Sequence, residues 1–273
     1  MKNTQQITKA MKQVAAARIR RAEALQKQSR PYADAIGAML RDLIASVGTV
    51  DHPFMRPGRE GAPKGLILMT ADKGLAGAFN SNVIRTGEIY AREQASNSRR
   101  YAVGNKARNA IRRSGQTAAF DAPLSTGAKI DTAKAIAARV TDDFTNGEIS
   151  EIVLIRSTMV SMLLQRPEVR TIVPIAAPER EATSGPRALV EFAPSPEAVL
   201  TRLLPKYLEF TLYAAMLETD AAFFAAQLIA MNNATDNAGK LIDELTIVMN
   251  KARQASITKE MLEIVGGAEA QAR

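Results

Sequence analysis

The sequence predicts an α/β domain inserted between two long helices that wind around each other as an antiparallel coiled coil. Three observations lead to this prediction: helical periodicity at both ends of the chain, strand patterns in its middle, and opposite charge on the two ends. The predicted domains are residues 1–50 for the first helix, 64–190 for the α/β domain and 196–273 for the second helix. We expect the helices to project well beyond the domain between them.

The first 50 residues have the pattern of one long helix. Apolar residues recur at spacings of three, four and seven from Ile7 to Val47. Pro31 interrupts this pattern and can kink a helix, but the periodicity resumes in phase on its far side. The segment from Asp51 to Lys64 is rich in Pro and Gly and is expected to end the helix.

The middle of the chain changes to short apolar runs bounded by turn residues. Two such runs, Gly65–Thr70 and Glu151–Arg156, predict buried strands, and Arg100–Val103 predicts a shorter one. Helical patterns lie between them, so we expect a parallel sheet with crossover helices in a Rossmann-like arrangement. Met159–Gln165 and Arg170–Ile175 are expected to close the domain as a hairpin.

The last third of the chain is helical again after a predicted linker at Thr183–Pro196. Nine small or apolar positions then alternate spacings of three and four: Leu228, Met231, Thr235, Ala238, Ile242, Leu245, Met249, Ala252 and Ser256. This 3.5-residue repeat is typical of a left-handed coiled coil. The N-terminal helix is the other long helix of the chain, so it is the expected partner. Gly266 and Gly267 are expected to end the second helix.

The two ends carry complementary charge. Residues 1–30 contain eight basic side chains and one acidic side chain, whereas residues 196–273 contain seven basic and ten acidic ones. This difference favours antiparallel pairing of the two helices. Alternatively, the basic segment of residues 1–30 is a face exposed to solvent, or a surface that binds nucleic acid, anionic lipid or an acidic protein. A basic coiled-coil protein that binds nucleic acid therefore stays open as an alternative.

The residue types argue against several kinds of chemistry. The chain has no cysteine and one histidine, so we expect no metal site, no thiol chemistry and no bound cofactor. No run of 18 apolar residues predicts a membrane span. The loop Ala71–Gly77 is a glycine-rich turn after a strand, which can cradle phosphate, but it lacks the spacing of the known phosphate-binding motifs. We expect a tight turn with Asp72 and Lys73 facing water, and a nucleotide-dependent enzyme is the second alternative.

Four runs of the sequence resemble characteristic segments of one protein family, the gamma subunits of bacterial F-type ATP synthases. They are Asn3–Lys12, Asp72–Asn80, Asn233–Ala238 and Asn250–Thr258. The resemblance spans nearly the whole chain. It implies a central rotor shaft that is not itself an enzyme and that transmits rotation between a proton-driven membrane ring and a catalytic hexamer, for ATP synthesis or for ATP-driven proton pumping.

The resemblance also implies partners and contact residues. The partners are the alpha and beta subunits of the hexamer, the epsilon subunit and the c-subunit ring, with one copy of the chain in each complex and no nucleic acid. Contacts with loops of the beta subunits are expected from Arg253, Gln254, Thr258, Lys9, Met11, Arg18 and Arg21. The base of the shaft, next to the ring and epsilon, is expected at Lys206, Tyr207 and Glu209. The implied location is the cytoplasmic side of a bacterial inner membrane, as a peripheral protein.

Two departures from the family pattern lie at the ends of the chain. Family members usually begin with a further basic helical stretch of about a dozen residues before the run that starts at Asn3, so roughly 20 Å of the upper shaft is expected to be a single helix. The family's C-terminal tail is commonly apolar, whereas Gln271 and Arg273 are polar. We therefore expect the tip of the shaft to be where this chain differs from its relatives.

Overall fold

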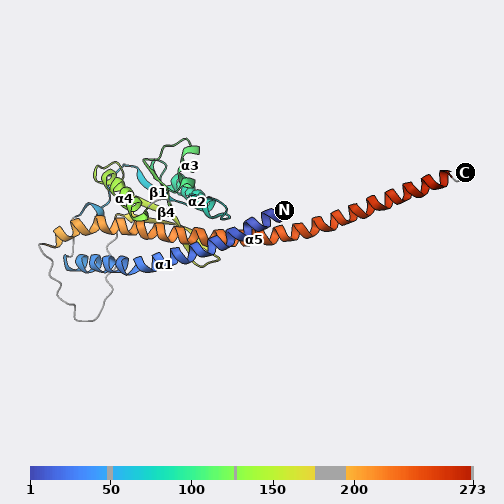
Figure 1. Ribbon diagram of the computed structural model, residues 1–273. Coiled ribbons are helices and arrows are strands. Elements are labelled where there is room, and N and C mark those ends of the chain that lie inside the picture. The colour runs from blue at the N-terminus through green and yellow to red at the C-terminus, as the bar shows by residue number, and fades with distance from the viewer. Residues whose placement is uncertain (48–51, 126–127, 176–194, 272–273) are drawn as a thin grey trace.

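The computed structural model describes residues 1–47, 52–125, 128–175 and 195–271. Figure 1 shows a rod of two antiparallel helices, α1 (Lys2–Val47) and α5 (Pro196–Gln271), with an α/β domain packed along one side. α5 continues far past the N-terminus of α1 and ends away from the rest of the molecule. This arrangement confirms the predicted fold class. The predicted domain boundaries at residues 50, 190 and 273, and the predicted linker up to residue 194, lie outside the described residues.

Polar and aromatic contacts fix the pairing of α1 with α5. Near the free end of the rod, Lys12 Nζ donates a hydrogen bond to Asn232 Oδ1 at 2.5 Å. Near the other end, the ring centroids of Tyr32 and Phe210 lie 4.2 Å apart. Residue numbers that rise along α1 face numbers that fall along α5, so the helices are antiparallel, as the repeat and the charges predict.

The α/β domain contains a five-stranded sheet in the order β3-β2-β1-β4-β5. Its strands are β1 (Lys64–Met69), β2 (Ser98–Val103), β3 (Phe120–Ala122), β4 (Ile152–Met159) and β5 (Gln165–Val173). Its helices are α2 (Phe79–Gln94), α3 (Asn105–Arg113) and α4 (Lys129–Thr145), and a short 3-10 turn, η1 (Pro53–Met55), precedes β1. The first four strands are parallel, and β5 pairs antiparallel with β4 at the edge.

Alternate residues along β1 pack into two different hydrophobic cores, one on each face of the sheet. Ile67 and Met69 of β1 pack with α4, α1 and α5, whereas Leu66 and Leu68 of the same strand pack with α2 and α3. This is the period of two that strands have, with both faces covered by helices. The larger core joins the sheet to the paired helices, so the domain and the lower part of the rod fold as one packed unit.

The coiled-coil prediction is correct for only half of the repeat. Ala238 is buried against α1, but every residue from 243 to 265 is exposed. Leu245, Met249, Ala252 and Ser256 therefore have no helix beside them in the described part of the chain. The reason is that α1 begins opposite about residue 242. The part of α5 beyond that point is about 43 Å long, more than the expected 20 Å.

Two local predictions are wrong, and one strand has no counterpart among the predictions. Residues 160–164 form the turn between β4 and β5, so the hairpin partner of β5 is β4 and not Met159–Gln165. The strand β3 was not predicted. α5 continues through Gly266 and Gly267 to Gln271 and does not end at the glycines. A glycine lowers the stability of a helix but ends it only when the backbone turns away.

Among the described helices, α5 is the one long and apolar enough to cross a membrane when judged by length and composition alone. Its qualifying 18-residue window has a mean hydropathy of 1.3. However, 67% of that window is buried inside the molecule. Core helices of soluble proteins pass the same test, so burial accounts for the apolar character of this stretch.

Candidate interaction surface of the shaft

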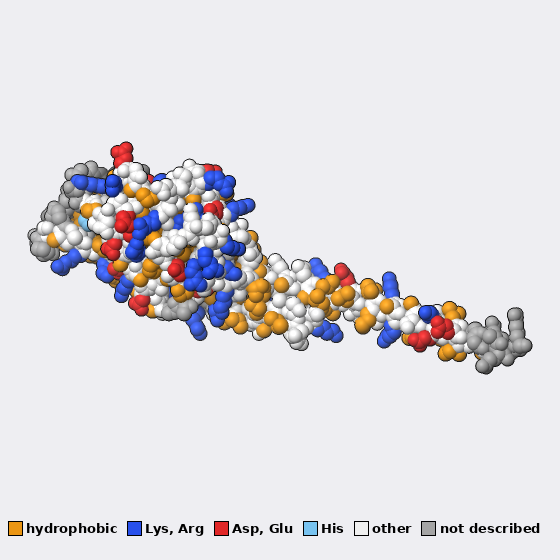
Figure 2. All heavy atoms as spheres, turned by 90° about the horizontal axis from the view of Figure 1, so that it is seen from above, with side chains coloured by type: hydrophobic (Ala, Val, Ile, Leu, Met, Phe, Trp, Pro, Cys, Tyr) orange, Lys and Arg blue, Asp and Glu red, His pale blue; other side chains and the backbone are white. Residues whose placement is uncertain are grey.

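The largest surface without a partner in the described chain is the projecting part of α5, residues 243–271, which we call the free end. Figure 2 shows it as a thin rod on which hydrophobic side chains alternate with basic and acidic ones. Its large apolar side chains are all about half exposed or more: Leu245, Ile247, Val248, Met249, Ile257, Met261, Leu262, Ile264 and Val265. Exposed apolar side chains at this density mark a surface for another protein.

Three of the predicted contact residues lie on this free end. Arg253, Gln254 and Thr258 are all exposed. Thr258 Oγ1 donates to the carbonyl oxygen of Gln254 at 2.9 Å, within the helix. The guanidinium of Arg253 and the amide of Gln254 therefore project from a rigid helix and are available to a partner.

The other four predicted contacts lie on α1 beside the paired part of α5. Lys9, Arg18 and Arg21 are exposed, and Met11 is half-buried. The Arg18 guanidinium stacks over Phe224 of α5, 5.4 Å from the ring centre, so this cation already has one partner inside the chain.

The structure does not bring the two groups of predicted contacts together. Thr8, next to Lys9, faces Thr235, with their hydroxyl oxygens 2.8 Å apart. Arg253 lies 18 residues further along α5, which corresponds to about 27 Å along the helix axis. The predicted contacts are therefore spread along the rod and form no single pocket. Such a distribution is typical of an extended interaction surface and not of a binding cleft.

The predicted base residues lie near the beginning of α5. Lys206 Nζ and Glu209 Oε2 form an ion pair of 2.8 Å one turn apart. Tyr207 is half-buried and lines a groove of about 450 Å³ between α1, α5 and β4, together with Phe210 and Asp34. Lys206 is the exposed member of the three and has the most surface to offer a partner.

The glycine-rich loop after β1 has a structural role that differs from the predicted one. Asp72 does not face water: its carboxylate accepts hydrogen bonds from the backbone amides of Asn105 and Leu124 at 3.0 Å and of Ser125 at 2.7 Å. Asn105 begins α3, so the carboxylate lies where the helix dipole favours an anion. An internal carboxylate thus occupies amides that a phosphate group would need. The signal for this role in the sequence is the position of Asp72 just after a buried strand, where a carboxylate can accept hydrogen bonds from backbone amides of neighbouring loops.

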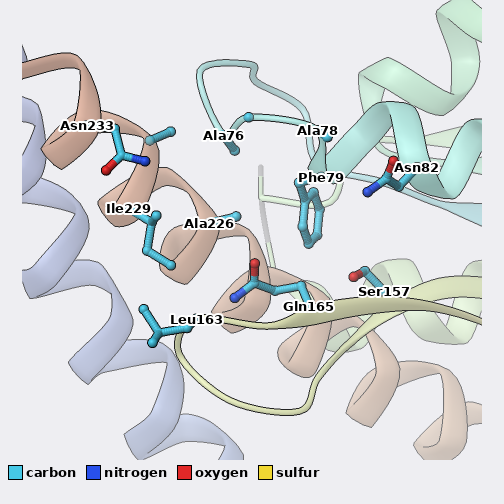
Figure 3. Close-up of a pocket in the computed structure, with 12 residues that line it drawn as sticks. Ala76, Ala78, Phe79, Asn82, Ser157, Leu163, Gln165, Ala226, Ile229 and Asn233 are labelled. Atoms are coloured by element: carbon cyan, nitrogen blue, oxygen red, sulfur yellow. The ribbon is translucent and has the colours of Figure 1, made fainter. Parts of the chain in front are cut away.

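A small cavity of about 210 Å³ lies where this loop and the β4–β5 hairpin meet α5 (Figure 3). Phe79 and Asn82 line it from α2, Leu163 from the β4–β5 turn, and Ile229 and Asn233 from α5. Leu163 is 81% exposed. The lining contains no charged side chain and no nucleophile paired with a base, so we find no catalytic arrangement there.

The fold and these surfaces define a class of protein: a stalk subunit, in which a long helix projects from an α/β domain to be surrounded by other chains. Sequence comparison identifies the family, since the family model described as ATP synthase matches residues 1–271. The chain belongs to the ATP synthase gamma family, which confirms the predicted resemblance.

Curated relatives support this membership over the full length. The ATP synthase gamma chain of Heliobacterium modesticaldum is 42% identical, with 99% of this chain and 95% of the relative covered. The gamma chain of Pelotomaculum thermopropionicum is 43% identical with the same coverage. Among solved structures, the central stalk and c-ring of the Tetrahymena thermophila mitochondrial ATP synthase contains a chain with a TM-score of 0.63 and 22% identity, covering 84% of this chain and 99% of that one. This last likeness shows a shared fold.

Proposed function

We propose that this chain is the central rotor shaft of a bacterial F-type ATP synthase and has no catalytic activity of its own. The observation that carries the proposal is the free end of α5, a single helix of 29 residues in which every side chain from residue 243 to residue 265 is exposed. A shaft inside a ring of alpha and beta subunits needs it, because the surrounding subunits cover its apolar residues.

The free end would stand inside the hexamer, with Arg253, Gln254 and Thr258 hydrogen-bonded to a beta-subunit loop. The exposed cations Lys9, Arg18 and Arg21 would face acidic loops of the beta subunits, with Met11 beside them. The α/β domain and the base residues Lys206, Tyr207 and Glu209 would lie towards the c-ring and epsilon. In this proposal the two helices, residues 1–50 and 196–273, form the shaft, and the α/β domain, residues 64–190, lies on the side of the c-ring.

Rotation of an asymmetric shaft presents a different face to each beta subunit in turn. A contact that stabilises one conformation of a subunit more than another shifts its population. Proton flow through the ring would thus drive ATP synthesis, and ATP hydrolysis would turn the shaft backwards. The complex would sit on the cytoplasmic side of the inner membrane, with one copy of this chain bound peripherally through its partners.

Single-molecule rotation tests this proposal directly. The chain has no cysteine, so Glu93→Cys on the exposed side of α2 gives one attachment point for a bead. The chain is assembled with an immobilised alpha and beta hexamer and given ATP. We expect the bead to turn in one direction, and the isolated chain to hydrolyse no ATP. A stationary bead on a hexamer that hydrolyses ATP, or turnover by the isolated chain, would contradict the proposal.

The residues at the contact are tested by a pair of matched variants. Arg253→Ala with Gln254→Ala removes the two polar groups expected to contact the hexamer, and we expect weaker binding and less torque. Lys251→Ala, an exposed cation on the same helix, serves as the control. Equal loss in both variants would show that only the charge of the free end matters, and that Arg253 and Gln254 have no specific role.

A further inference from the structure

Two groups of partly buried ion pairs join the α/β domain to one short stretch of α5. The first is centred on Arg156 of β4, whose side chain is 10% exposed. Its Nη1 lies 2.6 Å from Glu218 Oε2 of α5, and its Nη2 lies 3.3 Å from Glu168 Oε2 of β5. The sheet is thus tied to the helix through a shared guanidinium.

The second group is centred on Asp220, two residues further along α5. Lys129, the first residue of α4, places its Nζ 3.0 Å from Asp220 Oδ2, and Ser125 Oγ donates to Asp220 Oδ1 at 3.1 Å. The Lys129 and Asp220 side chains are 17% and 11% exposed. This pair fastens α5 to the α4 side of the domain.

Glu218 and Asp220 point to nearly opposite flanks of α5. Successive residues of an α-helix are turned by about 100°, so residues two apart differ by about 200°. Thr219, between them, is fully buried, and its hydroxyl lies 3.4 Å from Met69 Sδ of the central strand β1. Glu218 faces β4 and β5, Thr219 faces the middle of the sheet, and Asp220 faces α4. The domain therefore contacts α5 through ion pairs on two opposite sides of the helix, within three consecutive residues.

The hydrophobic effect is proportional to the apolar area buried and has no direction, so the shared core resists rotation of the domain only through its interdigitated side chains. An ion pair adds a directional restraint, and its separation leaves two charges that are only partly exposed to water without their partners, which is unfavourable. Turning the domain about α5 in either sense stretches the pair on one flank. The two flanks together resist rotation in both directions.

We propose that Glu218 and Asp220, with Arg156 and Lys129, form a two-sided lock that transfers torque between the α/β domain and α5. This inference rests on the proposed rotor function for its purpose, since a protein that carries no torque needs no such lock. The geometry of the lock is a property of the chain itself. The lock is therefore testable in the isolated full-length chain.

The first experiment measures how firmly the domain is held on α5. Cysteines introduced as Glu93→Cys on α2 and Lys240→Cys on α5, both exposed positions, carry spin labels for distance measurement by double electron–electron resonance. We expect one narrow distance distribution for the parent chain and a broader one for Glu218→Gln with Asp220→Asn. Single substitutions should broaden it less, because one flank remains tied.

Two further variants keep this test decisive. Lys129→Asp with Asp220→Lys exchanges the charges and should restore the narrow distribution that Asp220→Lys alone loses. The control Arg108→Gln with Asp121→Asn removes an ion pair that lies within the α/β domain and is about half exposed on both sides, and it should change nothing. If Glu218→Gln with Asp220→Asn keeps the parent distribution, the lock does not exist.

The second experiment measures torque transfer in the assembled complex in membrane vesicles. We expect the lock variants to pump fewer protons for each ATP hydrolysed than the parent, with the control unchanged. An unchanged ratio in the lock variants would overturn their role in torque transfer. If the parent chain itself gave no pumping in an intact complex, the proposed rotor function would be wrong, while the distance measurements would still decide the lock.

Discussion

The two parts of α5 differ in burial although one pattern of apolar residues runs through both. In the covered part, residues 196–242, Leu212 is fully buried between α1, α4 and the sheet. In the free end, Leu262 is 67% exposed. The fold of this chain explains the first leucine but not the second. Apolar residues in the covered part hold the chain together, whereas those of the free end have no neighbour in the described part of the chain.

The largest effect on the stability of the chain is expected from a cavity in the covered part. Leu212→Ala removes a side chain at the centre of the core that joins the rod to the domain, and should lower the free energy of unfolding by about 3 kcal/mol. Urea denaturation followed by circular dichroism measures this. Leu262→Ala is the matched control and should change it by less than about 0.5 kcal/mol. Equal losses would remove the distinction between the two parts.

A smaller effect is expected from a buried polar group of the same core. Tyr101 is fully buried, and its hydroxyl donates to Asp143, which also pairs with Arg99 and Arg139. Tyr101→Phe should cost about 1 to 2 kcal/mol, because the carboxylate loses one donor but keeps two cations. Tyr32→Phe, at an exposed ring, is the control.

The same tyrosine predicts a pH dependence. Burial raises the pKa of Tyr101 above its ordinary value of 10.0, and the hydrogen bond to Asp143 raises it further. The unfolded chain releases this proton near pH 10 while the folded chain keeps it, so the stability it provides is complete below pH 10 and is lost as the pH rises above it. Stability should fall by about 1.4 kcal/mol per pH unit from this group. Tyr101→Phe should remove that slope, and Tyr32→Phe should keep it.

A still smaller effect is expected where the pairing of α1 with α5 is about to end. The Thr235 hydroxyl lies 2.7 Å from the carbonyl oxygen of Met231 and 2.8 Å from the Thr8 hydroxyl. Thr235→Val keeps the shape and should cost about 1 kcal/mol, because the nearly buried Thr8 hydroxyl loses a neighbour. Thr246, on the free end, makes the same 2.7 Å bond to its own helix. Thr246→Val should therefore leave stability unchanged, and an equal loss would show that the bond within the helix is what matters.

The elements that could be predicted from the sequence are those in which a periodic apolar pattern extends over many residues. Both rod helices and their antiparallel pairing follow from repeated apolar spacing and from charge, and the parallel sheet follows from its apolar strands. The strand β3 was missed because it has three residues with an exposed Asp121 at its centre, and these make no apolar run. The turn at residues 160–164 was read as a strand because it is apolar, although most of its apolar side chains point outwards.

The contacts made by single charged residues were not predictable in the same way. Asp72, Glu218 and Asp220 belong to a loop and a helix, where carboxylates usually face water. Their partners come from segments between 33 and 95 residues away. Only the packing of distant elements decides which of many carboxylates is buried. The extent of the unpaired helix was likewise fixed by where α1 begins relative to α5 and not by the repeat itself, which continues without a break.

The smallest effect on the chain, and the sharpest test of the comparison, is expected from apolar residues at the free end. Met261→Gln with Leu262→Gln replaces two exposed apolar side chains by glutamine, which has a similar helix propensity. The free energy of unfolding should therefore change by less than about 0.5 kcal/mol. Binding to the alpha and beta hexamer, measured by co-purification, should nevertheless weaken, because two apolar groups are no longer buried there. Glu260→Gln, at an exposed neighbour, is the control. A loss of more than about 1 kcal/mol in the isolated chain would mean that the free end packs against the chain itself, and full binding by the double variant would mean that its apolar surface serves another partner.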